Sequence, residues 1–268
     1  MALNLFDRRA LLFLPASNPR AIARARSSDA DLVILDLEDA VKPADKAEAR
    51  RAAVAAIAQD WPMPVAIRIN GVGTPEHEAD LAALAHANCD LVVLPSVRSA
   101  DEVRGIKLGI PLAAMIESAA AVLDAPAIAQ HCDALILGTN DLAADLRLPA
   151  ADRSAMTYAL QATLVAARAA GIAVFDGVFN AMDDTEGFAA EAAQSRAMGF
   201  DGKTLIHPSQ IAPCHAAFAP SGEELARAAR LVAAATGGAE RFEGAMIETM
   251  HVDAARRLLA RQSAEGSR

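Results

Sequence analysis

Three carboxylates follow an apolar run near the start of the chain. The run Leu32–Leu35 is succeeded by Asp36, Glu38 and Asp39. Removing a carboxylate from water costs free energy unless a cation, a metal ion or hydrogen-bond donors compensate for it. Acidic side chains at the end of a buried strand therefore predict a binding or catalytic site. We expect a structural role for Asp36, which still lies inside the strand, and roles in the site for Glu38 and Asp39.

The same arrangement, an apolar run followed by polar or charged residues, recurs along the chain. Helix-like stretches rich in alanine and charged residues separate the runs, for example 45–59 and 152–170. Strands that alternate with helices favour parallel βαβ units, and eight of them favour a closed (β/α)8 barrel over an open sheet. The predicted strands are Ala10–Leu14, Leu32–Leu37, Val65–Ile69, Leu91–Leu94, Leu112–Ile116, Ala134–Leu137, Ile172–Phe175 and Lys203–Ile206.

The length and composition fit one α/β barrel. The chain has 268 residues, and a typical (β/α)8 barrel has ~250. Hydrophobic residues make up 53% of it and aromatic residues only 4%, so we expect a core of alanine, leucine, valine and isoleucine. We predict a barrel domain over 1–220 and a C-terminal helical extension over 221–268 that belongs to the same domain unit. Within the extension, Glu223–Ala235 and Asp253–Arg261 have helical patterns, and Gly237-Gly238 separates them.

The charge balance and the cysteines restrict the class of protein. The net charge of −9 argues against a nucleic-acid partner, which would require a basic face. No apolar run approaches the ~20 residues of a membrane span, and the N-terminus lacks the pattern of a signal peptide. Cys89, Cys132 and Cys214 lie far apart and are odd in number, which is typical of reduced thiols in a cytoplasmic protein.

In a (β/α)8 barrel the strand ends converge on one face, so side chains far apart in sequence meet there. An acidic cluster with one arginine suits a hard divalent cation, Mg2+ with Mn2+ as the alternative, and an oxygen-rich anionic ligand. Arg68 would offer a two-donor fork to a carboxylate or carbonyl, and the metal would stabilise an enolate. Beside such a cluster, a Schiff-base role for Lys203 is unnecessary. The charge-rich segment 45–51 is most simply a solvated helix face. The converging set is Asp36, Glu38, Asp39, Arg68, Asn70, Ser96, Glu117, Asn140, Asp141, Asp176, Lys203 and His207.

Six stretches in register carry a family resemblance. The chain resembles the citrate lyase beta-subunit-like proteins of the HpcH/HpaI aldolase group. The resemblance implies a barrel of the phosphoenolpyruvate/pyruvate type in which Glu117 and Asp141 hold Mg2+ and Arg68 orients the substrate. The stretches are Leu12-Phe-Leu-Pro, Leu35-Asp-Leu-Glu-Asp-Ala-Val, Arg68-Ile-Asn, Met115-Ile-Glu-Ser, Gly138-Thr-Asn-Asp-Leu and Gly199-Phe-Asp-Gly-Lys-Thr-Leu-Ile-His-Pro-Ser-Gln.

The resemblance also implies a carbon–carbon lyase that acts on (3-hydroxyacyl)-CoA thioesters such as citryl-, malyl- or citramalyl-CoA. Coenzyme A would be part of the substrate, with Arg20 and Arg24 near its phosphates. Arg24 stands where relatives commonly carry a lysine. Asn70 and Ser96 are further candidates for substrate binding. Relatives usually have a lysine at the position of Ser96, so the pocket wall differs here.

The C-terminal extension resembles the family tail, with Glu248 at the position of an aspartate that reaches a neighbouring subunit's site. Apolar side chains around it, among them Met246 and Met250, would be exposed on a lone monomer. The resemblance therefore implies a homotrimer or a dimer of trimers in which Glu248 acts as an acid–base group. Two alternatives stay open, namely a class II aldolase acting on free 2-oxo acids and a catalytically silent barrel subunit.

Overall fold

The computed structural model describes residues 3–149 and 152–265. The contacts within the chain divide it into two compact units, one that ends at Phe218 and one that begins at Ala219. This boundary lies two residues before the one predicted from the sequence. That the extension forms one domain unit with the barrel stays a prediction.

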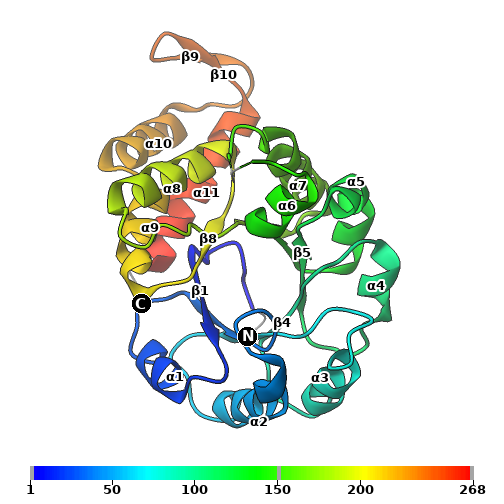
Figure 1. The fold of residues 1–268 in the computed structure, drawn as a ribbon. Coiled ribbons are helices and arrows are strands. Elements are labelled where there is room, and N and C mark those ends of the chain that lie inside the picture. The colour runs from blue at the N-terminus through cyan, green and yellow to red at the C-terminus, as the bar shows by residue number, and fades with distance from the viewer. Residues whose placement is uncertain (1–2, 150–151, 266–268) are drawn as a thin grey trace. The chain divides into compact units, whose positions relative to one another are not determined.

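The first unit is a closed barrel of eight parallel strands in sequential order, with β8 paired to β1 (Figure 1). This confirms the predicted (β/α)8 fold, and every predicted strand agrees with the structure to within one residue at either end. The strands are β1 (Ala10–Pro15), β2 (Leu32–Asp36), β3 (Val65–Arg68), β4 (Leu91–Leu94), β5 (Leu112–Ile116), β6 (Ala134–Leu137), β7 (Ala173–Asp176) and β8 (Gly202–Leu205).

Alternation along each strand decides which side chains point to the barrel axis. In β2, Leu32 and Ile34 belong to the cluster inside the barrel, whereas Val33 and Leu35 pack in the layer between strands and helices. Because side chains alternate with a period of two, the next inward position of β2 is Asp36. The same rule turns Arg68 inward at the end of β3. The fold thus brings a carboxylate and a guanidinium to the axis at the carboxyl ends of adjacent strands.

The strands are separated by helices that cover the outside of the barrel (Figure 1). One boundary differs clearly from the prediction, because the helix expected to begin at Asp152 begins at Thr157. The Asp152 side chain accepts hydrogen bonds from the Ser154 backbone and hydroxyl, both at 2.8 Å, and this local turn competes with helix formation. The helices are α1 (Pro19–Ala25), α2 (Lys46–Ile57), α3 (His77–Leu84), α4 (Ala100–Gly105), α5 (Ala119–Ile128), α6 (Thr139–Asp145), α7 (Thr157–Ala170), α8 (Thr185–Met198) and α9 (Ile211–Phe218), with short 3-10 turns at Pro43–Asp45, Ala129–His131 and Pro208–Gln210.

The second unit contains α10 (Gly222–Ala234), a hairpin of β9 (Glu240–Phe242) and β10 (Ala245–Ile247), and α11 (Thr249–Glu265). Its small core is built from alanine and aliphatic side chains of both helices and of β10. The hairpin was not predicted, and α11 starts four residues before the predicted helix. The turn between the two strands holds Glu243 and Gly244 at φ of 47° and 84°, a left-handed conformation that suits a two-residue hairpin.

No helix in the described ranges is long and apolar enough to cross a membrane. The three cysteines are all free thiols, and Cys89 and Cys214 are buried. Burial raises the pKa of the Cys89 thiol to about 11 and that of the Cys214 thiol to about 12, so both stay protonated at neutral pH.

Candidate active site

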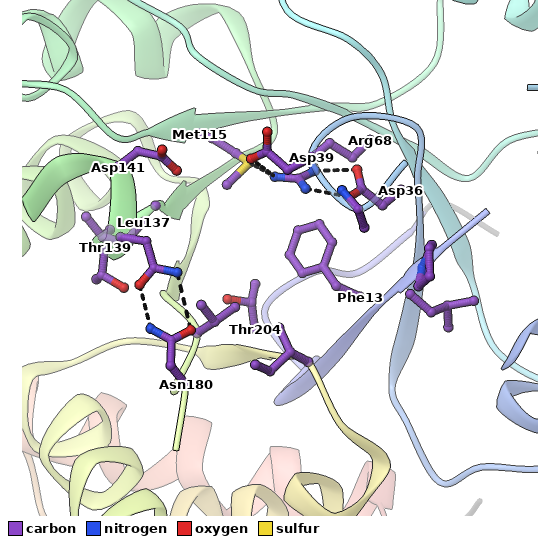
Figure 2. A pocket seen from close by; sticks show the side chains of 17 residues that line it. Phe13, Asp36, Asp39, Arg68, Met115, Leu137, Thr139, Asp141, Asn180 and Thr204 are labelled. Atoms are coloured by element: carbon purple, nitrogen blue, oxygen red, sulfur yellow. Dashed lines mark hydrogen bonds and ion pairs between the residues drawn. The ribbon is translucent and has the colours of Figure 1, made fainter. Parts of the chain in front are cut away.

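A cavity of about 380 Å³ opens at the carboxyl ends of the barrel strands (Figure 2). Every strand except β4 contributes to its lining, either from its last residues or from the loop that follows. The lining residues are Phe13, Leu14, Pro15, Asp36, Asp39, Ala40, Arg68, Met115, Leu137, Gly138, Thr139, Asn140, Asp141, Val178, Asn180, Thr204 and Ile206.

Arg68 is held at the cavity by Asp36, its direct neighbour across the β2–β3 pairing. Its Nε and Nη2 atoms each donate to an Asp36 carboxylate oxygen at 2.6 Å. Its guanidinium also lies 5.0 Å from the centre of the Phe13 ring. One two-donor edge of the predicted fork is therefore occupied by Asp36 (Figure 2). The Nη1 end faces the Glu38 carboxylate at 2.9 Å and is the part that a substrate anion could engage.

Glu38 is a carboxyl group that can change its charge near neutral pH. Its pKa is raised to about 7, chiefly by burial and also by the negative charges of Asp39, Glu117 and Asp36, while the positive charge of Arg68 opposes the rise. Asp39 lies at 3.9 Å from Arg68 Nη1 and is largely exposed. The two residues predicted for the site are thus both beside Arg68, but in different environments.

Glu117 and Asp141 carry carboxylates that repel each other. Glu117 follows β5 and is buried, and its Oε1 accepts a hydrogen bond from the Ser96 backbone N–H. Burial, and next the negative charge of Asp141, raises the pKa of Glu117. Asp141 lies in the first turn of α6, and burial followed by the charge of Asp39 raises its pKa too. Within the described ranges, neither carboxylate forms an ion pair with a basic side chain.

These two carboxylates fit the predicted Mg2+ site. A cation between them would offset the repulsion from Asp141 that adds to the raised pKa of Glu117, and the repulsion from Asp39 that adds to the raised pKa of Asp141. The described residues contain no group of three or more His, Cys, Asp and Glu side chains arranged for a metal. Mg2+, however, commonly binds to only one or two protein carboxylates, and water molecules and substrate oxygens complete its ligand set.

Gly138, at the end of β6, leaves room for the Glu117 side chain. A Cβ atom at this position would lie 2.5 Å from Glu117 Cβ and would also collide with its carboxylate. Gly138 thus allows Glu117 to pack against the strand end that precedes Asp141.

We expect Gly138→Ala to weaken Mg2+ binding at least about tenfold, because the new methyl group displaces Glu117. The measurement is a Mg2+ titration of the purified protein. Gly105→Ala is the matched control, since nothing lies within 4 Å of its new Cβ atom. Unchanged Mg2+ affinity in Gly138→Ala would contradict this role for the glycine.

Asn70 and Ser96, both predicted to bind substrate, do not line the cavity. The Asn70 carboxamide accepts from Lys46 Nζ and donates to Asp80 Oδ2, both at 2.6 Å. Ser96 has a φ of 53° and directs its backbone N–H to the Glu117 carboxylate. In this structure Asn70 links the end of β3 to α2 and α3, and the backbone of Ser96 positions Glu117.

Lys46 was missed as a functional residue. Its Nζ donates to the carbonyl oxygens of Leu37 at 2.8 Å and Glu38 at 2.7 Å, so it fixes the loop that carries Glu38. Segment 45–51 is therefore not simply a solvated face, since Arg50 also pairs with the buried Asp80. The acceptors of Lys46 are mostly backbone carbonyls, which leave no signal in the sequence.

Asp176 and Lys203 face away from the cavity. Lys203 Nζ is buried and donates to Asp176 Oδ2 and Glu191 Oε1, both at 2.7 Å. These contacts lie in the layer between strands and helices, as alternation along β7 and β8 requires. A Schiff-base role for Lys203 therefore has no support. His207 is exposed and contacts the Ser209 hydroxyl at 2.7 Å.

The residues predicted for coenzyme A and for the shared site lie outside the cavity lining. Arg20 and Arg24 are exposed and four residues apart on α1, and neither has an acidic partner among the described residues. Glu248 lies between β10 and α11 in the second unit, where its backbone N–H donates to His251 Nδ1 at 2.9 Å. Its predicted place in another subunit's site stays a prediction.

A family model described as HpcH/HpaI aldolase/citrate lyase matches residues 9–208, which include all eight strands. The chain belongs to this family. The resemblance seen in the sequence motifs is thereby confirmed.

Individual relatives extend the similarity to nearly the whole chain. A protein from Cereibacter sphaeroides called "(3S)-malyl-CoA thioesterase" is 41% identical, with 96% of this chain and 95% of that protein covered. The "Citrate lyase subunit beta" of Escherichia coli is 32% identical, with 97% and 95% covered. The crystal structure of CitE from Mycobacterium tuberculosis in complex with magnesium, acetoacetate and coenzyme A superposes with a TM-score of 0.87 at 34% identity, covering 97% of this chain and 100% of that one.

Proposed function

We propose that this chain is a Mg2+-dependent carbon–carbon lyase that cleaves or forms (3-hydroxyacyl)-CoA thioesters, with malyl-CoA as the first substrate to test. The observation that carries the proposal is the convergence of Arg68, Glu117 and Asp141, which interact electrostatically at one end of the barrel. This set suits a substrate with a free carboxylate and a carbonyl next to the reacting carbon. The names of the relatives support the same substrate class.

In the cleavage direction the bond between C2 and C3 of the thioester breaks. The 3-hydroxyl group loses its proton to a base, and the electrons of the C2–C3 bond move into the thioester carbonyl to give an enolate. A proton then adds to C2. Malyl-CoA would yield glyoxylate and acetyl-CoA, and the reverse sequence of steps would condense them.

The chain's own residues can supply the binding and proton-transfer steps. The Nη1 end of Arg68 binds the substrate carboxylate, with Asp36 fixing the guanidinium. Glu38, with a pKa raised to about 7 by burial, can take and return the hydroxyl proton. Glu117 and Asp141 would hold Mg2+, which supplies a Lewis acid for the negative charge on the substrate oxygens. Arg20 and Arg24 would bind the phosphates of coenzyme A.

Hydrolysis of the thioester is a second candidate activity. The observation that favours it is that four relatives, at 38% to 41% identity, are called (3S)-malyl-CoA thioesterase. Hydrolysis would place water at the thioester carbonyl in the same cavity and would release malate and free coenzyme A.

The test is one product analysis with Mg2+ on malyl-, citramalyl- and citryl-CoA and on free 2-oxo acids. Lyase activity releases an acyl-CoA and an oxo acid, whereas hydrolysis releases a free thiol and the intact hydroxy acid. Cleavage of free 2-oxo acids alone would support the class II aldolase. No turnover of any substrate by folded, Mg2+-loaded protein would overturn the proposal in favour of a silent subunit.

We also propose that the protein is cytoplasmic and assembles as a homotrimer or a dimer of trimers. Met246 and Met250 of the second unit are 68% and 62% exposed, and exposed apolar side chains of this size suit a subunit interface. Glu248 lies between them in sequence and would complete the active site of a neighbouring subunit as an acid–base group.

Mixing two inactive variants tests the shared site. Arg68→Ala removes the barrel's contribution to the shared active site, and Glu248→Ala removes the contribution of the C-terminal unit. Mixed oligomers contain some sites with both residues intact, so they should recover part of the activity that each parent lacks. The measurement is turnover after subunit exchange, with exchange verified by a tagged subunit. Demonstrated exchange without recovery, or a monomer in sedimentation, would rule out the shared site.

A further inference from the structure

The cavity has one charged wall and one uncharged wall. β1, β8 and the segments that follow β7 and β8 contribute only uncharged side chains to the lining. Figure 2 shows Asp141, Asp39 and Arg68 on one side of the cavity, with Asn180 and Thr204 opposite. The ionisable lining residues come from the ends of β2, β3 and β6, namely Asp36, Asp39, Arg68 and Asp141.

Two asparagines join the walls through a reciprocal hydrogen bond. Asn180 Nδ2 donates to Asn140 Oδ1 at 2.6 Å, and Asn140 Nδ2 donates to Asn180 Oδ1 at 3.3 Å (Figure 2). A carboxamide has two N–H donors and two acceptor lone pairs. Each asparagine therefore keeps one donor and one acceptor without a partner among the described residues. Both side chains are exposed and line the cavity.

The loop that presents Asn180 is anchored by its neighbour. The Phe179 carbonyl accepts a hydrogen bond from Gln210 Nε2 at 3.0 Å. The Phe179 ring packs edge-to-face on Phe188, with ring centres 5.9 Å apart. Asn140 is fixed on the first turn of α6, directly before Asp141. The pair is thus a positioned recognition element rather than two free surface side chains.

We propose that the Asn140–Asn180 pair is the specificity-determining element for the uncharged thioester arm of the substrate, binding one of its amide groups. This inference rests on the proposed function and adds the orientation of the substrate. Donor and acceptor positions together complement an amide, which offers both N–H and C=O. The substrate's anionic end then lies against Arg68 on the charged wall.

The neutrality of the pair is part of its role. An aspartate at position 140 would place a negative charge directly before Asp141 in the first turn of α6, so it would change the metal site as well as the recognition element. Asn180 lies on the uncharged wall. In Asn180→Asp a carboxylate replaces the carboxamide, which removes its N–H donors and places the new negative charge on the wall opposite Asp141. Asn180→Asp therefore isolates recognition from metal binding better than Asn140→Asp does.

The test measures dissociation constants of three probes for the wild type and for Asn180→Asp. The probes are acetyl-CoA, which carries the arm without the anionic end, oxaloacetate, which carries the anionic end without the arm, and Mg2+ alone. We expect acetyl-CoA to bind about tenfold more weakly to the variant, with less than twofold change for oxaloacetate and Mg2+. Asn88→Asp, an exposed asparagine outside the cavity lining, controls for the added charge and should change none of the three.

Unchanged acetyl-CoA binding in Asn180→Asp, or an equal loss for acetyl-CoA and oxaloacetate, would overturn the role of the pair. Absence of acetyl-CoA binding to the wild type would overturn it as well. The proposed function fails separately, when the wild type binds acetyl-CoA but turns over no thioester. A weakened acetyl-CoA complex in that case would still support the recognition role.

Discussion

Glu117→Gln should lower kcat/KM for the thioester substrate by at least about a hundredfold and weaken Mg2+ binding. The substitution keeps the shape of the side chain, and its amide oxygen can still accept the hydrogen bond from the Ser96 backbone. What is lost is one of the two charges that would hold the cation. The measurements are steady-state kinetics and a Mg2+ titration.

The stability of metal-free Glu117→Gln separates an effect on the site from an effect on the fold. Burial and the charge of Asp141 raise the pKa of Glu117 in the folded protein above its value in the unfolded chain. Ionisation of Glu117 therefore destabilises the folded state once the pH exceeds the pKa that this glutamate has in the unfolded chain. The variant should therefore unfold at an equal or higher temperature than the wild type at pH 8. Glu102→Gln is the matched control, since Glu102 also accepts a backbone N–H, from Arg98 at 2.7 Å, but lies on the surface. Mg2+ affinity within threefold of the wild type in Glu117→Gln would exclude Glu117 as a ligand.

Arg68→Ala should lower the free energy of unfolding by about 3–5 kcal/mol. The reason is that Asp36 is 1% exposed and would become a buried charge without its partner. Arg68→Lys should keep part of the stability, because one ammonium can still pair with Asp36. It should nevertheless lose about a hundredfold in kcat/KM, since a lysine cannot hold Asp36 with two donors and face the substrate at once. Urea unfolding and kinetics measure the two effects.

A double variant, Asp36→Leu with Arg68→Leu, removes both buried charges together. It should recover much of the stability lost in Arg68→Ala, because the Asp36 carboxylate is no longer left buried without its partner, while activity stays absent. Arg68→Ala with wild-type stability would show that the pair is not structurally coupled. Near-normal kcat/KM in Arg68→Lys would show that the arginine is only a counter-ion for Asp36.

The barrel could be predicted because its physical signals are local. Strands covered on both faces need continuous apolar runs, such as Leu91–Leu94 and Leu112–Ile116, and these two strands agree with the prediction at both ends. The hairpin of the second unit was missed because each of its strands has only three residues. Its turn residues, Glu243 and Gly244, are a weaker signal than asparagine followed by glycine.

The predicted site set mixed residues that face the cavity with residues that face the helices. A residue at the carboxyl end of a strand lies at the correct end of the barrel. Whether its side chain points to the barrel axis or to the helices depends on its place in the alternation of side chains along the strand. Asp176 and Lys203 fail on this point, whereas Asp36 and Arg68 satisfy it. Counting inward positions from the apolar interior of each strand would have separated the two groups.

Contacts across loops could not be predicted from the sequence alone. Lys46 holds backbone carbonyls of the loop after β2, and Asn180 reaches Asn140 from a loop forty residues further along the chain. Neither contact follows from a motif, because the three-dimensional paths of these loops decide which atoms meet. The pairing of Asp36 with Arg68 is different, since the register of two adjacent strands places them side by side.

We expect a divalent cation and the substrate's anionic end to share the cavity lined by Arg68 and Asp141. The most direct measurement is a crystal structure with Mn2+ and a small 2-oxo acid, in which anomalous scattering locates the ion. We predict one ion bound by Glu117 and Asp141 at about 2.0–2.2 Å, with the acid against the Nη1 end of Arg68. An ion bound elsewhere, or these two carboxylates turned away from it, would contradict the account.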